Sequence, residues 1–242
     1  SHRHCYVGSN YINGGETAGA LLKMIGPAKA NIGIIMGSSK VLGHKQRLNG
    51  FKNNIKHTAN FNIIDVQENE DDDILSYDKT KNMLETYPHI NVLFIVAAGV
   101  YGACRAAIAC NRQDITILAF DTVPTTIDML KKGVIKAVIY QHPYRQGQRS
   151  MQIVFEYLVN GIKPDRKMYI MKNEIKITRN EMLKEDAYYM QKNPGHAIVE
   201  NKNYDYPSNK PVFVEPIFAK VEFMPYETKE GIWHEQIGRA HV

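Results

Sequence analysis

Short runs of apolar, β-branched residues alternate with longer amphipathic stretches over residues 5–179. The short runs predict strands at 5–9, 31–37, 61–68, 92–98, 115–121, 136–141 and 167–178. The longer stretches predict helices at 14–25, 42–57, 73–87, 101–111, 125–132 and 144–160. Strict alternation of strand and helix is typical of an α/β fold with parallel strands and helices on both faces of the sheet.

Two of these helices carry an apolar stripe at positions i, i+3 and i+7. The stripes are Leu48, Phe51 and Ile55 in one helix and Met151, Val154 and Leu158 in the other. We expect each stripe to need a sheet to pack against. The helix ends are marked as well, because an acidic run at 68–73 precedes one helix and Gly133 follows another. That acidic run lacks the alternating ligands of a calcium loop, so we predict no metal site.

The composition is that of a globular protein, with 44% apolar and 23% charged residues. The longest apolar run, 92–98, has strand length and falls far short of the roughly 20 residues that a membrane-spanning helix needs. Three cysteines, Cys5, Cys104 and Cys110, form no CxxC pair and have no histidine at ligand spacing. They favour small buried thiols over a disulfide framework or a zinc site.

The last quarter of the chain differs from the rest. Residues 181–242 hold seven basic and ten acidic residues and five of the ten prolines, so the net positive charge belongs to residues 1–180. The pattern from about Pro194 onward indicates an irregular extension. Residues 237–242 resemble one reading frame of a widely used sequencing adapter, and we interpret them as a translation artefact. The chain begins with Ser1, which we interpret as the interior of a longer protein.

Polar residues collect where the predicted strands end, at the edge where open parallel sheets bind ligands. These positions are 37–39, 68–69, 98–101, 121–122 and 141–142. The chain has no Gly-x-Ser-x-Gly elbow, no Gly-x-Gly-x-x-Gly and no phosphate loop ending in Gly-Lys-Ser/Thr, which disfavours a hydrolase and a nucleotide-binding protein. A helix N-terminus around Ser38 can still bind an anion or a ligand hydroxyl.

Four residues at this edge suit a neutral polyhydroxylated ligand. Asp121 accepts hydroxyl protons, Arg47 donates in a fork, Gln141 does both, and Tyr101 offers a flat face for a sugar ring. Each has an ordinary alternative, respectively a strand-end cap, a surface ion pair, a helix cap and core filling. The spacing alone does not decide between the two interpretations.

Separated motifs occur in register over about 180 residues, in the order known from one family. They are YVGSNYINGG at 6–15, IIMG at 34–37 with QRLNGF at 46–51, FDTVP at 120–124 and QHPYRQG at 141–147. At these residues the sequence resembles the sugar-binding core of lactose/galactose-repressor-type transcription regulators and the related periplasmic sugar-binding proteins. The resemblance implies a periplasmic-binding-protein-like type I fold, with a complete C-terminal lobe and a partial N-terminal lobe.

The resemblance also implies which residues contact the ligand. Arg47, Asp121 and Gln141 are expected on the sugar, with Asn10 or Tyr11 near the cleft between the lobes. The family usually has an Asn-Asp pair after the fourth strand, where this chain has Ala-Gly-Val-Tyr at 98–101. We expect Tyr101 to replace the missing polar contact by stacking. No catalytic residue, cofactor or metal is implied.

The family architecture divides the chain into segments. We expect a remnant of the N-terminal lobe at 1–28, the C-terminal lobe at 29–138, a return to the N-terminal lobe at 139–166 and a final crossover strand at 167–180, followed by the extension at 181–236 and the artefact at 237–242. The stripe of Met151, Val154 and Leu158 would then be exposed, because its sheet is incomplete.

The function that this resemblance favours is the effector domain of a bacterial transcription regulator, not an enzyme. In such a regulator we expect a small carbohydrate to close two lobes and thereby to control DNA binding by a helix-turn-helix module N-terminal to this segment. Such a regulator is cytoplasmic, a homodimer when full length, and contacts DNA only through that module and no membrane. The alternative is an extracytoplasmic sugar-binding protein of an ABC transporter, or the sensor domain of a membrane receptor.

Overall fold

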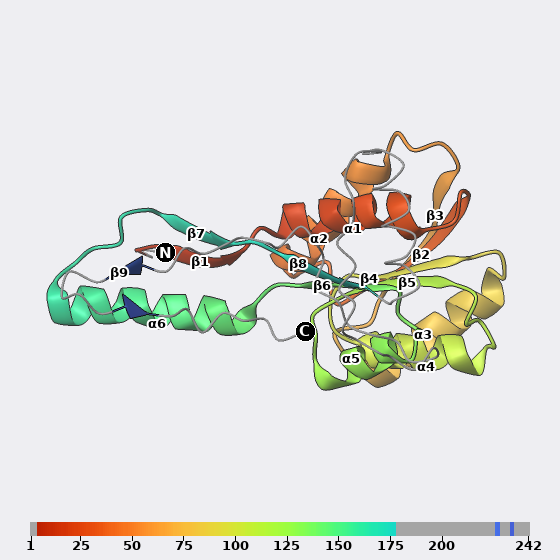
Figure 1. Ribbon diagram of the computed structural model, residues 1–242. Coiled ribbons are helices and arrows are strands. Elements are labelled where there is room, and N and C mark those ends of the chain that lie inside the picture. The colour runs from red at the N-terminus through yellow and green to blue at the C-terminus, as the bar shows by residue number, and fades with distance from the viewer. Residues whose placement is uncertain (1–3, 178–225, 228–232, 235–242) are drawn as a thin grey trace, which may run out of the picture.

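The computed structural model describes residues 4–177, 226–227 and 233–234 (Figure 1). The strands are β1 (Tyr6–Ser9), β2 (Ala30–Met36), β3 (Phe61–Glu68), β4 (Val92–Ile95), β5 (Thr116–Phe120), β6 (Ala137–Tyr140), β7 (Met168–Met171), β8 (Glu174–Ile177), β9 (Tyr226–Glu227) and β10 (Trp233–His234). The helices are α1 (Tyr11–Ile25), α2 (Leu42–Ile55), α3 (Asp73–Thr86), α4 (Val100–Ala109), α5 (Pro124–Lys131) and α6 (Pro143–Asn160). The predictions for 181–236 and 237–242 lie outside the described residues, apart from the two short strands β9 and β10.

A six-stranded sheet in the order β3-β2-β4-β5-β6-β8 forms the centre of one lobe. The first five strands are parallel, as the alternating pattern predicts, and β8 at the edge is antiparallel to β6. Helices α1 and α2 lie on one face of the sheet and α3, α4 and α5 on the other (Figure 1). The α/β fold with a mostly parallel sheet is therefore confirmed.

Central strands of this sheet are buried on both faces, so successive residues enter different hydrophobic clusters. In β4, Val92 and Phe94 join the cluster under α1 and α2, whereas Leu93 and Ile95 join the one under α3, α4 and α5. Strands covered on both faces have continuous apolar runs rather than alternating ones. This is why the run around 92–98 is recognisable in the sequence.

The expected single strand at 167–178 is wrong, because the structure divides it into β7 and β8. β7 pairs in parallel with β1, whereas β8 pairs with β6 of the large sheet. Strand β6 runs out of the lobe toward α6, and the chain re-enters the lobe from that side after β7 (Figure 1). A strand that re-enters from the carboxyl end of β6 must run antiparallel to it, which also explains the departure from an all-parallel sheet.

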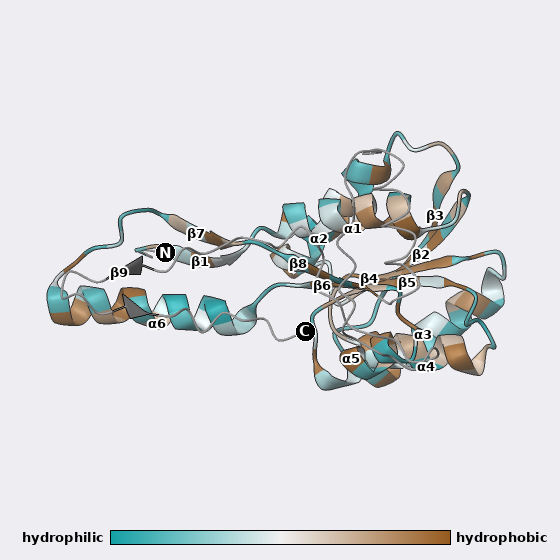
Figure 2. Cartoon of the chain, viewed as in Figure 1, coloured by the Kyte–Doolittle hydropathy of each residue, from teal (hydrophilic) through white to brown (hydrophobic). Residues whose placement is uncertain are grey.

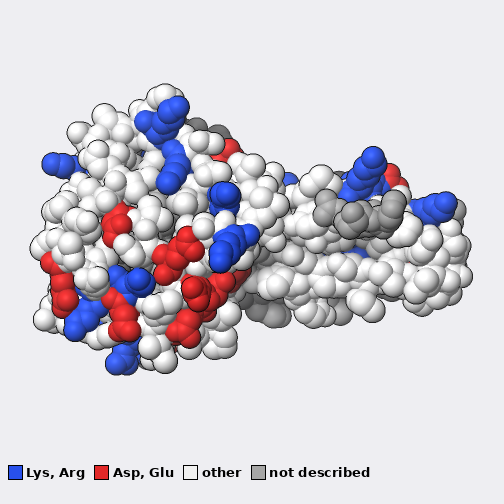
Figure 3. All heavy atoms as spheres, turned by 180° about the vertical axis from the view of Figure 1, so that it is seen from behind, with Lys and Arg blue, Asp and Glu red and all other residues white. Residues whose placement is uncertain are grey.

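An elongated arm, made of β1, β7 and α6, extends from the lobe (Figure 1). The apolar stripe of α6 is exposed as expected, with Met151 at 68% and Leu158 at 73% exposure. Figure 2 shows the apolar turns along this helix, and Figure 3 shows a largely uncharged surface along the arm beside the mixed charges of the lobe. Among the described residues no helix is long and apolar enough to cross a membrane.

Helix α1 lies on the lobe and not on the arm. Its residues Ala18, Leu22 and Ile25 belong to the same hydrophobic cluster as the α2 stripe of Leu48, Phe51 and Ile55. The expected assignment places residues 1–28 in the N-terminal lobe. In the structure, β1 is the element of this segment that lies in the arm, whereas α1 packs on the other lobe. The physical reason is that α1 buries its apolar face against the large sheet.

Several helices begin earlier than their apolar patterns predict. Helix α1 begins at Tyr11 because Asn10 caps it, accepting a hydrogen bond from the backbone N–H of Asn13 at 3.1 Å. Helices α5 and α6 begin at Pro124 and Pro143, since proline suits the first helical turn. The acidic run does begin a helix, with the Asp72 carboxylate capping α3. Gly133, with φ of 74°, follows α5 as predicted.

Candidate functional site

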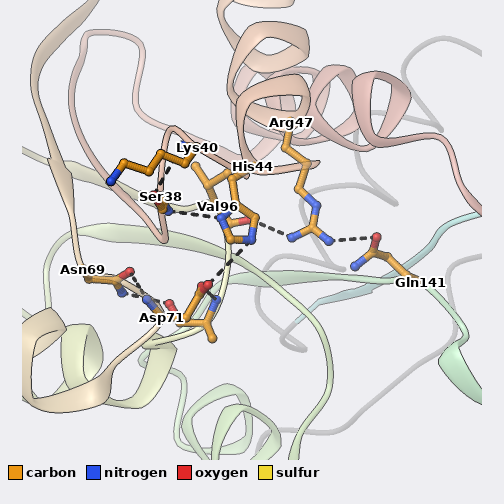
Figure 4. Close-up of polar contacts among 9 residues, drawn as sticks. Ser38, Lys40, His44, Arg47, Asn69, Asp71, Val96 and Gln141 are labelled. Carbon is orange, nitrogen blue, oxygen red and sulfur yellow. Dashed lines mark hydrogen bonds and ion pairs between the residues drawn. The ribbon is translucent and has the colours of Figure 1, made fainter. Parts of the chain in front are cut away.

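Arg47 lies at the carboxyl edge of the large sheet, where ligands bind in open parallel sheets. Arg47 belongs to α2, the helix that covers one face of the sheet, and the residue is only 7% exposed. Nη1 donates to the carbonyl oxygen of Val96 at 2.8 Å, and Nη2 donates to Oε1 of Gln141 at 3.0 Å (Figure 4). The guanidinium group is thus held across the ends of β4 and β6.

Gln141 extends this arrangement to Asp121. Its Nε2 donates to Oδ1 of Asp121 at 2.8 Å, while its Oε1 accepts from Arg47, so both ends of the amide are used and its orientation is determined. Asp121 follows β5 with a left-handed φ of 65°, and its backbone N–H donates to the carbonyl oxygen of Ile139. The structure therefore brings together Arg47, Gln141 and Asp121, three predicted site residues from three different elements.

Two aromatic rings flank the guanidinium group. The Cζ atom of Arg47 lies 4.4 Å from the ring centre of Phe120 and 5.3 Å from that of Tyr11. Desolvation lowers the pKa of Arg47, and the negative charge of Asp121, followed by Tyr11 and Asp71, acts in the opposite direction. An arginine remains protonated under such conditions, so the site contains a charge pair of opposite signs. Tyr11 therefore lies beside Arg47.

One donor of this group has no partner. The Nε atom of Arg47 is buried and makes no hydrogen bond within the described part of the chain. Buried donors without partners are rare in proteins, because each costs free energy. The Oδ2 atom of Asp121 also makes no hydrogen bond to any described residue. The cluster thus retains unused hydrogen-bonding capacity of both kinds.

A second polar group lies beside it, at the ends of β2, β3 and β4. The backbone N–H of Ser38 donates to Nδ1 of His44 at 3.1 Å, and Nε2 of His44 lies 3.8 Å from Oδ2 of Asp71 (Figure 4). The Oδ1 atom of Asp71 accepts from the backbone N–H of Ala98 at 3.1 Å. Asn69, which is fully buried, donates from Nδ2 to the carbonyl oxygen of Ala98 at 2.9 Å.

The remaining predicted site residues have mainly structural contacts. Asn10 caps α1 through its Oδ1 atom. Ser38 donates its backbone N–H to His44 of α2, and its Oγ atom accepts the backbone N–H of Lys40. Tyr101 lies on α4 and packs against the hydrophobic cluster of α3, α4 and α5, on the other face of the sheet from Arg47. No contact joins Tyr101 to the Arg47 group in the described part of the chain, and its side chain is partly buried.

Sequence reasoning missed His44 and Asp71. Asn69 is one of the strand-end positions, so its place after β3 already indicates a site at this edge of the sheet. His44 gives no such signal, because it stands within a helix and meets Asp71 only through the loop after β3. That loop has two successive residues with positive φ, Glu70 and Asp71, which a sequence pattern without glycine does not reveal.

Hydrogen bonds and an ion pair join the segments that connect the arm to the lobe near Gln141. Its backbone carbonyl oxygen accepts from Nε2 of Gln146 at 2.6 Å and from Oγ of Ser9 at 3.4 Å. The next residue, His142, places Nε2 at 3.0 Å from Oε2 of Glu174. Glu174 also contacts Nζ of Lys176 at 2.6 Å, and these contacts, that of His142 first, lower the pKa of Glu174 to about 2.

A model of the family described as the periplasmic binding protein domain matches residues 1–162. The chain belongs to this family. Its fold, an α/β arrangement with a mostly parallel sheet, is that of periplasmic-binding-protein-like domains. This confirms the fold that the sequence motifs imply.

Relatives of this periplasmic binding protein domain carry names of sugar-binding proteins. The ribose import binding protein RbsB of Salmonella typhimurium is 22% identical over 154 residues, which cover 63% of this chain and 52% of RbsB. GanP, a glucose-galactose binding protein from Geobacillus stearothermophilus, is 26% identical with a TM-score of 0.69, over 77% of this chain and 64% of GanP.

A third relative has been solved together with a partner. XylFII, in a complex with LytSN, is 28% identical with a TM-score of 0.65, over 72% of this chain and 62% of XylFII. The chain spans about half the length of the curated relatives it matches. RbsB and GanP are binding proteins by name, which is consistent with the expectation of a non-enzyme.

Proposed function

We propose that this chain binds a neutral sugar as part of an extracytoplasmic sugar-binding protein that serves an ABC transporter. The observation that carries the proposal is the buried chain of hydrogen bonds from Arg47 through Gln141 to Asp121. It places a guanidinium group and a carboxylate at the sheet edge, and Oδ2 of Asp121 makes no hydrogen bond to any described residue. A polyhydroxylated ligand needs such a mixture of donors and acceptors.

The charges favour a neutral ligand over an anion. An isolated buried arginine would suit a carboxylate or phosphate group. Here Asp121 offsets the positive charge of Arg47 electrostatically and shares Gln141 with it. The rings of Phe120 and Tyr11 add apolar surface, which matches the C–H faces of a sugar ring. The described residues of the site include no nucleophile hydrogen-bonded to a base, so the proposal is one of binding.

The relatives support a monosaccharide ligand and an extracytoplasmic location. RbsB is a ribose import protein and GanP binds glucose and galactose, according to their names. Pentoses and hexoses are therefore the sugars to test first. The complex of XylFII with LytSN supports a variant of the proposal, in which the protein acts together with a partner protein.

The repressor interpretation has less support. None of the relatives reported above is a transcription regulator, and none supports contact with DNA, homodimer formation or a cytoplasmic location. The sequence upstream of Ser1 distinguishes the two: a secretion signal supports the transport protein, and a helix-turn-helix module supports the regulator.

The segments are proposed to act as parts of two lobes that close on the sugar. Helix α1 and residues 29–138, with β8, form one lobe, and the arm contributes to the other. Because Gln141 stands where β6 leaves the lobe, the ligand site lies beside the connections between them. Ligand contacts from both sides would favour the closed arrangement.

The proposal is tested by calorimetry on the protein expressed from its full open reading frame. D-ribose, D-xylose, L-arabinose, D-glucose and D-galactose are titrated into the wild type, Arg47→Ala and Arg105→Ala. We expect the wild type to bind at least one sugar, and Arg47→Ala to lose at least about tenfold in affinity, because buried partners of a charged donor are left unpaired. Arg105 is exposed on α4 and serves as the control. Failure of the wild type to bind any of these sugars contradicts the proposal.

A further inference from the structure

His44 and Asp71 form a polar pair one helical turn from Arg47. His44 precedes Arg47 by three residues on α2, so both side chains leave the same face of the helix. Figure 4 shows the His44 ring pointing toward Asp71 on the side of the Arg47 guanidinium group. The side chains of His44 and Asp71 are 14% and 40% exposed, so a solute can reach the pair.

Each member of the pair is held by its other polar atom. Nδ1 of His44 accepts the Ser38 backbone N–H, which places the proton of the neutral ring on Nε2. Oδ1 of Asp71 accepts the Ala98 backbone N–H, and the Asp71 backbone N–H donates to the buried Asn69. The Oδ2 atom of Asp71 makes no hydrogen bond to any described residue. A donor and an acceptor are therefore oriented and unused.

Gly37, in the loop after β2, allows His44 and Asp71 to pack against the backbone. A Cβ atom at Gly37 would overlap the Asp71 carboxylate and lie 2.6 Å from Cε1 of His44. The backbone of Gly37 therefore packs directly against both side chains. Such close packing limits the freedom of the pair before any ligand arrives, which lowers the entropic cost of binding.

The distance between the two atoms indicates what fits. At 3.8 Å, Nε2 of His44 and Oδ2 of Asp71 are too far apart for a good hydrogen bond. A hydroxyl oxygen beside both atoms accepts from Nε2–H and donates to Oδ2 at ordinary distances. A hydroxyl group is both donor and acceptor, whereas an ether oxygen cannot donate and an ammonium group cannot accept.

We propose that His44 and Asp71 form a specificity-determining subsite for one hydroxyl group of the sugar held by Arg47 and Asp121. The inference rests on the proposed function and extends it, because it names a contact that distinguishes a sugar from its deoxy analogue. It also supplies a polar contact near the end of β4, where Ala97 and Ala98 offer no polar side chain.

The test is a double-mutant cycle between protein and ligand. The probes are the sugar that binds the wild type best and its series of monodeoxy analogues, titrated into the full-length wild type, His44→Ala, His44→Gln and Asp71→Asn. Lys45→Ala and Asp78→Asn are controls, since both residues are exposed on the surfaces of α2 and α3. Circular dichroism confirms folding, and His44→Gln retains a donor if the alanine variant does not fold.

The deciding measurement is the affinity for the deoxy analogue that lacks the hydroxyl group bound by His44 and Asp71. We expect His44→Ala and Asp71→Asn to weaken binding of the parent sugar about tenfold, and to leave the affinity for one deoxy analogue unchanged. Equal weakening for every analogue, or no change for the parent sugar, overturns the subsite while the loss of binding in Arg47→Ala still upholds the proposed function. A wild type that binds none of the sugars overturns both.

Discussion

Gly15 of α1 packs directly against the backbone carbonyl of Arg47, the residue that provides the guanidinium group of the candidate site. A Cβ atom at Gly15 would overlap that oxygen and lie 2.8 Å from the backbone nitrogen of Phe51. Gly50 of α2 meets the carbonyl group of Ile12 in the same way. The two helices approach through glycines, and this contact determines where Arg47 stands above the sheet.

Gly15→Ala is therefore expected to destabilise the lobe and to disturb sugar binding together. Overlap between backbone atoms forces the helices apart, at a cost of about 1–3 kcal/mol in the free energy of unfolding. Chemical denaturation measures the change. Gly147→Ala is the control, because no atom lies within 4 Å of a Cβ there, and alanine raises helix stability by about 0.5–1 kcal/mol. An unchanged midpoint in Gly15→Ala would show that the helices do not approach this closely.

Asp121→Asn should weaken sugar binding without disturbing the backbone. Asparagine tolerates the left-handed φ of 65° and keeps an oxygen for Gln141, but it removes the charge opposite Arg47. Charge-assisted hydrogen bonds are about twice as strong as neutral ones, so we expect a loss of about tenfold in affinity. Calorimetry measures it. Asp128→Asn, on the surface of α5, should bind like the wild type; equal affinities in both variants would remove Asp121 from the site.

Acid stability should depend on Glu174. Its pKa is lowered from 4.5 to about 2, chiefly by the hydrogen bond from His142. A carboxyl group whose pKa is lower in the folded state stabilises the fold above its ordinary pKa. That contribution decreases as the pH falls from about 4.5 toward 2. Thermal unfolding from pH 6 to about pH 2.5 is therefore expected to be less pH-dependent in Glu174→Gln than in the wild type. Glu85→Gln, an exposed partner of Lys81, should retain the wild-type slope.

The exposed stripe of α6 should bind a hydrophobic dye in the 242-residue chain. Met151, Val154 and Leu158 are all exposed on the arm, and apolar surface of this kind attracts such dyes. Met151→Gln combined with Leu158→Gln should reduce the dye fluorescence at least twofold, because it removes apolar surface, while denaturant unfolding of the lobe stays the same. A wild-type chain that binds no dye and unfolds in one sharp transition would contradict this expectation.

The sequence predicts the central sheet well because burial on both faces demands continuous apolar strands. The edge of the sheet is harder to predict, since the apolar and β-branched residues at 167–178 are compatible with one long strand or with two short ones. Only the path of the chain between arm and lobe divides this segment at Lys172 and Asn173. The helix beginning at Tyr11 is likewise set by the Asn10 cap and not by an apolar residue.

The candidate site was predictable in part. Asp121 and Gln141 directly follow strands, and Arg47 stands in a motif, so sequence reasoning brings all three to the same edge. The meeting of His44 with Asp71 depends on a loop conformation with positive φ at Glu70 and Asp71. Tyr101 packs on the cluster of α3, α4 and α5, because position after a strand does not determine which face of the sheet a helical side chain meets.

Gln141 belongs to two systems through its two amide groups. Its side chain joins Arg47 to Asp121, and its backbone carbonyl oxygen is held by Ser9 and Gln146 of the connections to the arm. Thermodynamic linkage between sugar binding and arm orientation is reciprocal. If sugar binding stabilises one orientation of the arm, fixing that orientation raises the affinity for sugar by the same free energy. A cross-link that locks the arm would therefore act as an effector without touching the ligand.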